Sequence, residues 1–240
     1  MKRIFSVSIL SGLMLVSAFN QELSLDQVLQ HYFQATGFDK MQQLKTIRMT
    51  GTITKQTTMP LKIIKMRPAK YKMENDVADI YTCQTYDGQT AWEITTPWTG
   101  NTKPHSMKAD ATNEIIVKAD FDGVLFHWKE KGHKAELTGK EKYNDSIVYK
   151  IRLTRNDGVI EYYFINSVSF LLVKKSRMVT SDGKEIESIS TFTDFREIGG
   201  IKFPYTNENF MDGQFYSIIE YDTIEVNQRI DPAIFEMSAK

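Results

Sequence analysis

Side chains that could carry out chemistry are spread along this 240-residue chain without forming a catalytic pattern. His127, Glu130 and His133 come closest to a metal site, but their spacing matches no zinc motif. Gly132 is expected to break a helix between them, and a solvated helix end explains them better. No serine lies in a Gly-x-Ser-x-Gly elbow, and no glycine-rich phosphate loop is present. We therefore expect a protein that is not an enzyme and has no catalytic residue, metal or cofactor.

Two acidic residues and the single cysteine also have structural explanations. Asp120 and Asp122 are better assigned to capping and starting a helix than to a catalytic dyad. Cys83 is the only cysteine and cannot form a disulfide within the chain. No motif surrounds it, so we expect a small buried strand residue rather than a reactive thiol.

The charge balance argues against a nucleic-acid partner. Lys and Arg together number 30, as do Asp and Glu, and no basic run is interleaved with aromatic residues. Hydrophobic residues make up 41% of the chain, which is typical of a globular protein. We expect a monomer.

The first eighteen residues, MKRIFSVSILSGLMLVSA, have the pattern of a cleaved secretory signal peptide. Lys2 and Arg3 give a basic start, an apolar core runs over 4–16, and small residues precede a cut after Ala18. No cysteine lies at the cut to carry acyl chains, so the exported chain is expected not to be lipid-anchored. Residues 19–240 are expected to form a single domain.

A helix is predicted from Ser24, which can form a capping box with Gln27, to Gly37, which is suited to end it. Its apolar residues recur at helical spacing on one face: Leu25, Val28, Leu29, Tyr32 and Phe33. This face either packs on a sheet or forms one wall of an apolar cavity, and the spacing is compatible with both.

From Thr46 onward the hydrophobic period changes to two, which is typical of half-buried strands. Short turns such as Asp87-Gly88 suit antiparallel hairpins, and a sheet of about ten or eleven twisted strands must curl. We expect an α+β, mainly β fold, in which an incomplete antiparallel barrel is covered by the N-terminal helix and mid-chain lid helices. The expected strands are 46–53, 61–66, 70–74, 80–86, 90–95, 134–140, 147–154, 159–165, 171–179, 185–195 and 215–226.

Residues 108–132 interrupt the strands with helical spacing. We expect two short helices, split near 120–123, that lie as a lid across the concave face of the sheet. The bulky apolar residues that would form its inner surface are Ile115, Ile116, Phe121, Val124, Leu125 and Trp128.

The two other tryptophans have different expected environments. Trp92 follows a hairpin turn and is expected in the core. Trp98 lies in a long loop, and because loops run over the surface it is a candidate for an exposed rim or partner contact.

Three short motifs stand in a characteristic order along the chain. Arg67 and Pro68 form an Arg-Pro step, the sequence DGQTAW occupies 87–92 with Pro97 after it, and DPAIF occupies 231–235. These motifs resemble the Arg-Pro step, the Asp-Gly-x-Thr-x-Trp hairpin and the closing Asp-x-x-x-Phe segment of LolA-type outer-membrane lipoprotein-sorting proteins. With the signal peptide, the first helix and the run of strands, the resemblance covers nearly the whole mature chain.

The resemblance implies a soluble periplasmic carrier that takes acyl chains of lipoproteins or lipids into an apolar cavity between half-barrel and lid. An inner-membrane donor complex would load it and an outer-membrane acceptor would unload it. The resemblance also implies that Arg67 holds the lid shut by hydrogen bonds to lid backbone, whereas the residues alone favour a surface charge beside a strand-ending proline. The implied site comprises Arg67, Pro68, Trp92, Leu29 and Phe33 together with the inner residues of the lid.

A second function on the same fold stays open at this point. An envelope sensor or adaptor protein would bind an apolar ligand or peptide and would signal by protein contact, because a fold by itself does not fix a function.

Overall fold

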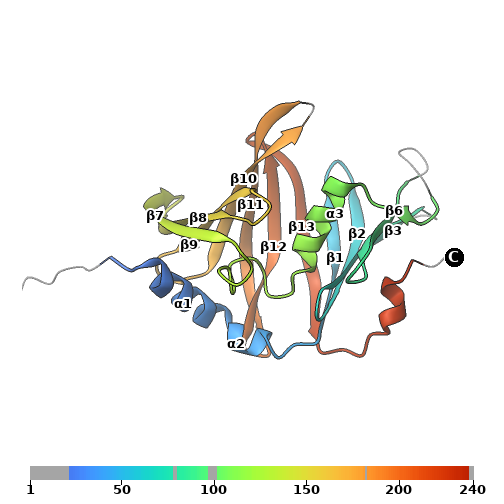
Figure 1. The fold of residues 1–240 in the computed structure, drawn as a ribbon, viewed down its shortest axis with the longest axis horizontal. Coiled ribbons are helices and arrows are strands. Elements are labelled where there is room, and N and C mark those ends of the chain that lie inside the picture. The colour runs from blue at the N-terminus through green and yellow to red at the C-terminus, as the bar shows by residue number, and fades with distance from the viewer. Residues whose placement is uncertain (1–21, 78–79, 97–101, 182, 238–240) are drawn as a thin grey trace, which may run out of the picture.

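The computed structural model describes residues 22–77, 80–96, 102–181 and 183–237 (Figure 1). The predicted signal peptide, Pro97 and Trp98 lie outside the described residues. None of the described helices has the length and apolar character needed to cross a bilayer.

In the described part of the chain, thirteen strands form one antiparallel sheet that does not close, with β6 and β7 at its two edges. The order across the sheet is β6-β5-β4-β3-β2-β1-β13-β12-β11-β10-β9-β8-β7. This confirms the predicted mainly β fold with a curved open sheet (Figure 1). The strands are β1 (Thr46–Thr54), β2 (Thr58–Met66), β3 (Lys70–Val77), β4 (Ile80–Tyr86), β5 (Ala91–Ile94), β6 (His105–Ser106), β7 (Lys134–Tyr143), β8 (Ser146–Thr154), β9 (Ile160–Asn166), β10 (Leu172–Ser181), β11 (Lys184–Ile198), β12 (Ile201–Met211) and β13 (Gln214–Val226).

Two of these strands are absent from the sequence prediction. β6 has two residues, which is too short for a periodic pattern. β12 contains Pro204 and polar residues at Asn207 and Asn209, so its sequence lacks the alternation of a half-buried strand. Pro204 is tolerated because β12 pairs with β13 only from Thr206 onward, so the missing N–H falls where β12 has one partner strand.

The first helix is built as its sequence predicts. α1 (Leu25–Thr36) begins after Ser24, whose hydroxyl accepts a hydrogen bond from the Gln27 amide at 3.3 Å, and Gln27 Oε1 accepts one from the Ser24 amide at 2.9 Å. Gly37 ends α1 with φ of 74° and leads directly into the short α2 (Phe38–Met41).

Of the two predicted lid helices, the first forms and the second does not. α3 (Ala109–Ala119) forms as expected, but residues 120–132 are a series of turns rather than a second helix. Gly123, His127 and Gly132 all have φ between 51° and 75°, and a right-handed helix cannot continue through that backbone region. In residues 120–132 the apolar residues recur at helical spacing because they lie on the buried side of consecutive turns, and not because the segment is a helix. A short 3₁₀ helix, η1 (Pro232–Phe235), follows the last strand.

Three apolar clusters line the side of the sheet that carries the helices. The first joins α1 to β8 and β9 through Val28, Leu29, Ile151 and Tyr163; the second joins β1, β12 and β13; the third joins α3 to β2, β3 and β5. Cys83 of β4 is 3% exposed and lies in a fourth cluster with Trp92, which confirms its prediction as a buried strand residue.

Candidate functional site

The lid, defined as α3 and the turns through residue 132, packs its apolar side onto all three clusters. Ile115 contacts the cluster of Leu61 and Ile63, and it is 1% exposed. Phe121 belongs to the second cluster, and Val124 and Leu125 belong to the first. The lid therefore bridges separate apolar regions of the sheet.

A group of charged residues, which we call the clasp, fixes the middle of the lid. Arg67, in the turn directly after β2, donates from Nη1 to Asp122 Oδ2 at 2.8 Å, and its Nε and Nη2 donate to the carbonyls of Leu44 and Met41 at 2.8 and 3.1 Å. Its guanidinium also stacks 4.3 Å from the ring centroid of Phe121. Arg67 thus joins the lid to the segment between α2 and β1.

Two lysines complete the clasp. Lys65 donates to the Asp120 carbonyl at 2.9 Å, and Lys131 donates at 2.7 Å to both Asp120 Oδ2 and the Gly123 carbonyl. Lys65 near the end of β2 and Arg67 just after that strand are two residues apart, and both side chains reach the lid. The resemblance implies that Arg67 bonds lid backbone; in the structure Arg67 bonds the Asp122 side chain, and Lys65 bonds the lid backbone.

Within the clasp, the surroundings favour the ionised form of Asp122 and disfavour the charged form of Lys65. Burial alone would raise the pKa of Asp122, but the hydrogen bonds and charge of Arg67, with Lys131 and Lys65 nearby, hold that pKa below its ordinary value. Burial lowers the pKa of Lys65 to about 8, against the opposing charges of Asp120 and Asp122. The clasp therefore includes one charge, that of Lys65, whose burial cost the neighbouring carboxylates offset only in part.

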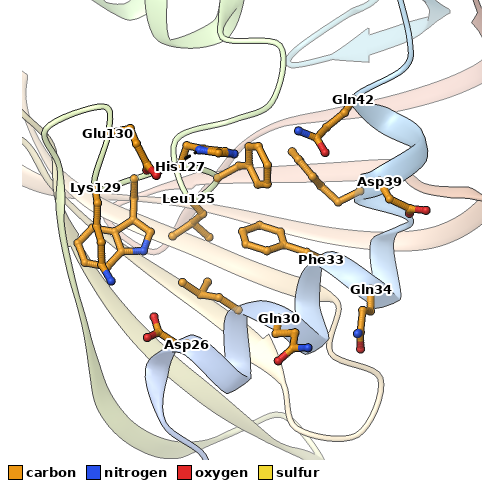
Figure 2. Close-up of a pocket in the computed structure, with 14 residues that line it drawn as sticks. Asp26, Gln30, Phe33, Gln34, Asp39, Gln42, Leu125, His127, Lys129 and Glu130 are labelled. Atoms are coloured by element: carbon orange, nitrogen blue, oxygen red, sulfur yellow. Dashed lines mark ion pairs between the residues drawn. The ribbon is translucent and has the colours of Figure 1, made fainter.

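An open groove lies between α1 and the turns of the lid, with a volume of about 520 Å³. Phe33 projects from α1 into the groove toward Leu125, whereas Gln30 and Gln34 lie along its outer edge (Figure 2). Phe126 meets Phe33 edge-on with ring centroids 5.3 Å apart, and it lies 4.0 Å from the ring of Phe38. This volume is in the range of small-molecule sites, and aromatic rings form much of the wall.

The structure brings together some of the predicted site residues and separates others. Leu29, Phe33, Leu125 and Trp128 line the groove, and Arg67 meets Phe121 at the clasp. Ile115 and Val124 are buried beneath the lid. Pro68 is exposed at the turn after β2, and Ile116 is 42% exposed and faces a separate pocket beside Arg155.

Trp92 lies on the other face of the sheet. Its neighbour Ala91 packs with Ile115 of the lid, and consecutive strand residues point to opposite faces. The indole instead packs with Cys83 and donates to the Phe235 carbonyl at 2.9 Å. Trp92 is therefore a core residue that ties η1 to the back of the sheet.

Sequence reasoning missed the acidic half of the clasp and two rings of the groove. Asp120 and Asp122 were assigned to helix capping, yet their spacing of two matches that of Lys65 and Arg67, which was an available signal. Phe38 and Phe126 gave no such signal, because each lies outside the helical stripe of its own segment.

His127 of the lid and His133, directly after it, do not converge on a metal site. His127 lies 3.4 Å from Glu130, and His133 instead accepts a hydrogen bond from the Asn156 amide at 3.1 Å. Among the residues that the structure describes, no three His, Cys, Asp or Glu side chains are grouped so as to hold a metal ion.

No protein-family model and no curated protein sequence matches this chain. Solved structures do match its fold. A LolA superfamily protein from Nitrosomonas europaea is 14% identical over 90% of this chain and 98% of its own, with a TM-score of 0.59. A DUF1329 family protein from Desulfovibrio piger is 13% identical over 87% of this chain and 97% of its own, with a TM-score of 0.61.

A third match is described as an outer membrane lipoprotein-sorting protein domain, from Vibrio parahaemolyticus. It is 9% identical over 87% of this chain and 97% of its own, with a TM-score of 0.59. At these identities the likeness is one of fold. The chain has the fold of the LolA-type lipoprotein-sorting proteins, the family that its short motifs resemble.

Proposed function

We propose that the mature chain, residues 19–240, is a single-domain carrier in the bacterial periplasm. It binds the acyl chains of lipoproteins or lipids between the half-barrel and the lid, and it passes them from an inner-membrane donor toward an outer-membrane acceptor. The observation that carries this proposal is the construction of the lid: its inner side is apolar, while its middle is held by the polar clasp.

This construction suits reversible opening. An acyl chain can replace the core contacts of Ile115, Val124 and Leu125 without exposing apolar surface, and each buried methylene is worth about 0.8 kcal/mol. Clasp groups released by opening can exchange their hydrogen bonds for water at modest net cost. The cost of opening offsets part of the binding energy, which prevents a long chain from being held too tightly for release.

The groove beside α1 offers an acyl chain an apolar surface that is already open. Leu29 and Leu125 line the groove and also belong to the first apolar cluster, so the groove borders that cluster. Phe33 and Trp128 extend this surface toward solvent.

The clasp gives the central test. In Arg67→Leu the lid opens at lower cost, so the fraction of binding-competent protein rises. We expect this variant to retain more apolar cargo when purified from envelope extract, and to pass an acyl probe to acceptor vesicles roughly tenfold more slowly than wild type. Mass spectrometry of the copurifying lipids and acylated proteins measures retention, and probe fluorescence measures transfer.

Arg48→Leu is the matched control, because Arg48 forms a comparable pair with Glu225 through Nε at 2.7 Å, outside the clasp. Unchanged retention and transfer in Arg67→Leu, or the absence of any apolar cargo, would contradict the proposal. A chain that binds the probe but never transfers it would instead fit the sensor or adaptor function.

A further inference from the structure

The face of the sheet beneath the lid carries polar side chains where an acyl-chain site would be expected to be apolar. Lys175 of β10 pairs with Ser190 of β11, Ser190 with Asn209 of β12, and Asn209 with Ser217 of β13. Directly paired residues of neighbouring strands lie on the same face. Ser190 Oγ lies 2.7 Å from Asn209 Oδ1, and Asn209 Nδ2 donates to Ser217 Oγ at 3.2 Å. We call these four residues the polar row.

The polar row lies on the face that the lid covers. Its first member, Lys175, pairs with Tyr163, which packs in the same cluster as Val124 and Leu125 of the lid. Ile219, two residues after Ser217 and on the same face, packs in the cluster of Ile115. The row therefore crosses the concave face between two apolar regions.

A pair of guanidinium groups adjoins the row. Arg177 lies two residues beyond Lys175 on β10 and donates from Nη1 and Nη2 to the two carboxylate oxygens of Glu114 at 2.7 and 2.8 Å. Glu114 belongs to α3, so the lid itself supplies this carboxylate. Arg155, whose side chain is 2% exposed, lies with Nη2 3.9 Å from Glu114 Oε1. The arrangement is a forked cationic site with a carboxylate in it.

The charges around this site leave a surplus when the lid moves away. Arg155 contacts Glu161 at 3.5 Å and also pairs with Asp157, while Lys175 contacts Glu161 at 2.9 Å. Lys118 of α3 also lies near Glu114 and Arg177, and it leaves together with Glu114 when the lid moves. The three cations that stay on the sheet, Arg155, Lys175 and Arg177, then face two carboxylates. Opening the lid therefore exposes one uncompensated positive charge at the end of the polar row.

A polar group beside the row is also left without a partner. The side-chain oxygen of Asn207, two residues from Asn209 on β12, is buried and accepts no hydrogen bond from the described residues. Burying an unpaired acceptor costs free energy, and an apolar side chain would avoid that cost. The row and the cationic pair thus form a polar site within an otherwise apolar face.

We propose that this site binds the anionic group, a carboxylate or a phosphate, of an amphiphilic ligand, and that Glu114 occupies the position of that group while the lid is closed. The ligand's acyl chain lies against the apolar clusters on either side of the row. This inference rests on the proposed carrier function and specifies its ligand class. Entry of the anion and release of Glu114 are then one exchange on Arg177, which couples ligand binding to lid opening.

The test compares three ligands of equal chain length, dodecanoate, dodecyl phosphate and dodecanol, titrated into the mature chain by calorimetry. The two anions are kept below their micelle concentrations and dodecanol below its solubility limit. We expect at least one anion to bind about tenfold or more tightly than dodecanol, because charge-assisted hydrogen bonds are the stronger class. Preference for dodecyl phosphate would indicate a phospholipid head group, and preference for dodecanoate a fatty acid; both support the site.

Two variants separate the anion site from general opening of the lid. Arg177→Met should reduce the ratio of anion to dodecanol affinity to near one. Glu114→Gln should raise that ratio several-fold, because it removes the internal competitor. Arg152→Met and Glu136→Gln break a comparable pair, 3.2 Å apart between β7 and β8, and should leave the ratio unchanged.

Equal affinity of wild type for the anions and dodecanol, or a ratio that survives Arg177→Met, would overturn the anion site while leaving the carrier function intact. Binding of none of the three ligands would overturn both. If Arg177→Met does not fold, Glu114→Gln decides the matter, because an unchanged ratio in that variant contradicts the exchange on Arg177.

Discussion

At the scale of single residues, the clasp holds the lid in part through a hydrogen bond from a lysine, Lys65, whose charged form is disfavoured by burial. Lys65 is held close to Asp120 and Asp122, yet burial dominates and lowers its pKa to about 8. Below that pH the folded protein carries a desolvated ammonium that the unfolded chain hydrates freely. Lys65 therefore gives the lid hydrogen bonds and electrostatic contacts while reducing the stability of the closed state.

This leads to a prediction about pH. The ordinary lysine pKa is about 10.4, so between pH 8 and about pH 10 the unfolded chain binds more protons than the folded chain, and stability rises with pH. We expect the free energy of unfolding of wild type, relative to Lys65→Met, to increase by roughly 1–2 kcal/mol over this window. Urea unfolding at a series of pH values measures the difference.

Lys62→Met, on the opposite face of β2, serves as the control. If the difference in free energy of unfolding between wild type and Lys65→Met does not change between pH 8 and about pH 10, burial does not lower the pKa of Lys65.

At the scale of elements, the junction of α1 and α2 positions the groove. Gly37 ends α1 with φ of 74°, and a Cβ added there would lie 2.0 Å from the backbone oxygen of Gly200 in the turn between β11 and β12. The close approach sets α1 against the sheet and places Phe33 and Phe38 on either side of the junction. The geometry of the groove therefore depends on a glycine outside it.

We expect Gly37→Ala to destabilise the fold by at least about 2 kcal/mol more than Gly213→Ala. Gly213 has nearly the same φ, 73°, but nothing lies within 4 Å of its added Cβ, so only backbone strain of roughly 1–2 kcal/mol applies there. Thermal or urea unfolding of both variants gives the comparison. Equal losses would mean that the chain relaxes around the contact with Gly200.

At the scale of the whole molecule, the lid connects the two walls of the open sheet. On one wall Ile115 packs against β2 and β3, and Arg67, directly after β2, holds Asp122. On the other wall Arg177 of β10 holds Glu114. The sheet itself continues between these walls through β1, β13, β12 and β11, so the lid can move without breaking the strand pairing.

We expect the lid to open as a unit below the free energy of global unfolding. In Arg67→Leu and in Arg177→Met, backbone amides of residues 109–132 should exchange with solvent deuterium at least about tenfold faster than in wild type. Amides of β11, β12 and β13 should be unaffected, and Arg48→Leu should resemble wild type. Equal acceleration throughout the sheet would show that lid and sheet unfold together, which would leave no independent opening step.

Several features of the fold could be predicted because neighbouring residues determine them. Ser24 and Gln27 form the capping box through hydrogen bonds across three positions, and Gly37 ends the helix by its own backbone conformation. Most strands were predicted by their alternation, which depends only on one face being buried. β12 was not, because its inward residues Asn207 and Asn209 are polar, and those same residues lie in or beside the polar row.

The sequence by itself determined the mainly β fold, the first helix, the place of the lid in the chain and the likeness to the LolA-type family. Only the tertiary structure decided which charges meet: Arg67 with Asp122, and Arg177 with Glu114, which lie 55 and 63 residues apart. It also decided that Trp92 faces away from the lid. The reason is physical. Local hydrogen bonding and hydrophobic period fix an element from within, whereas the face that each strand turns toward the lid, and the partner of each charge, depend on how the whole sheet curls.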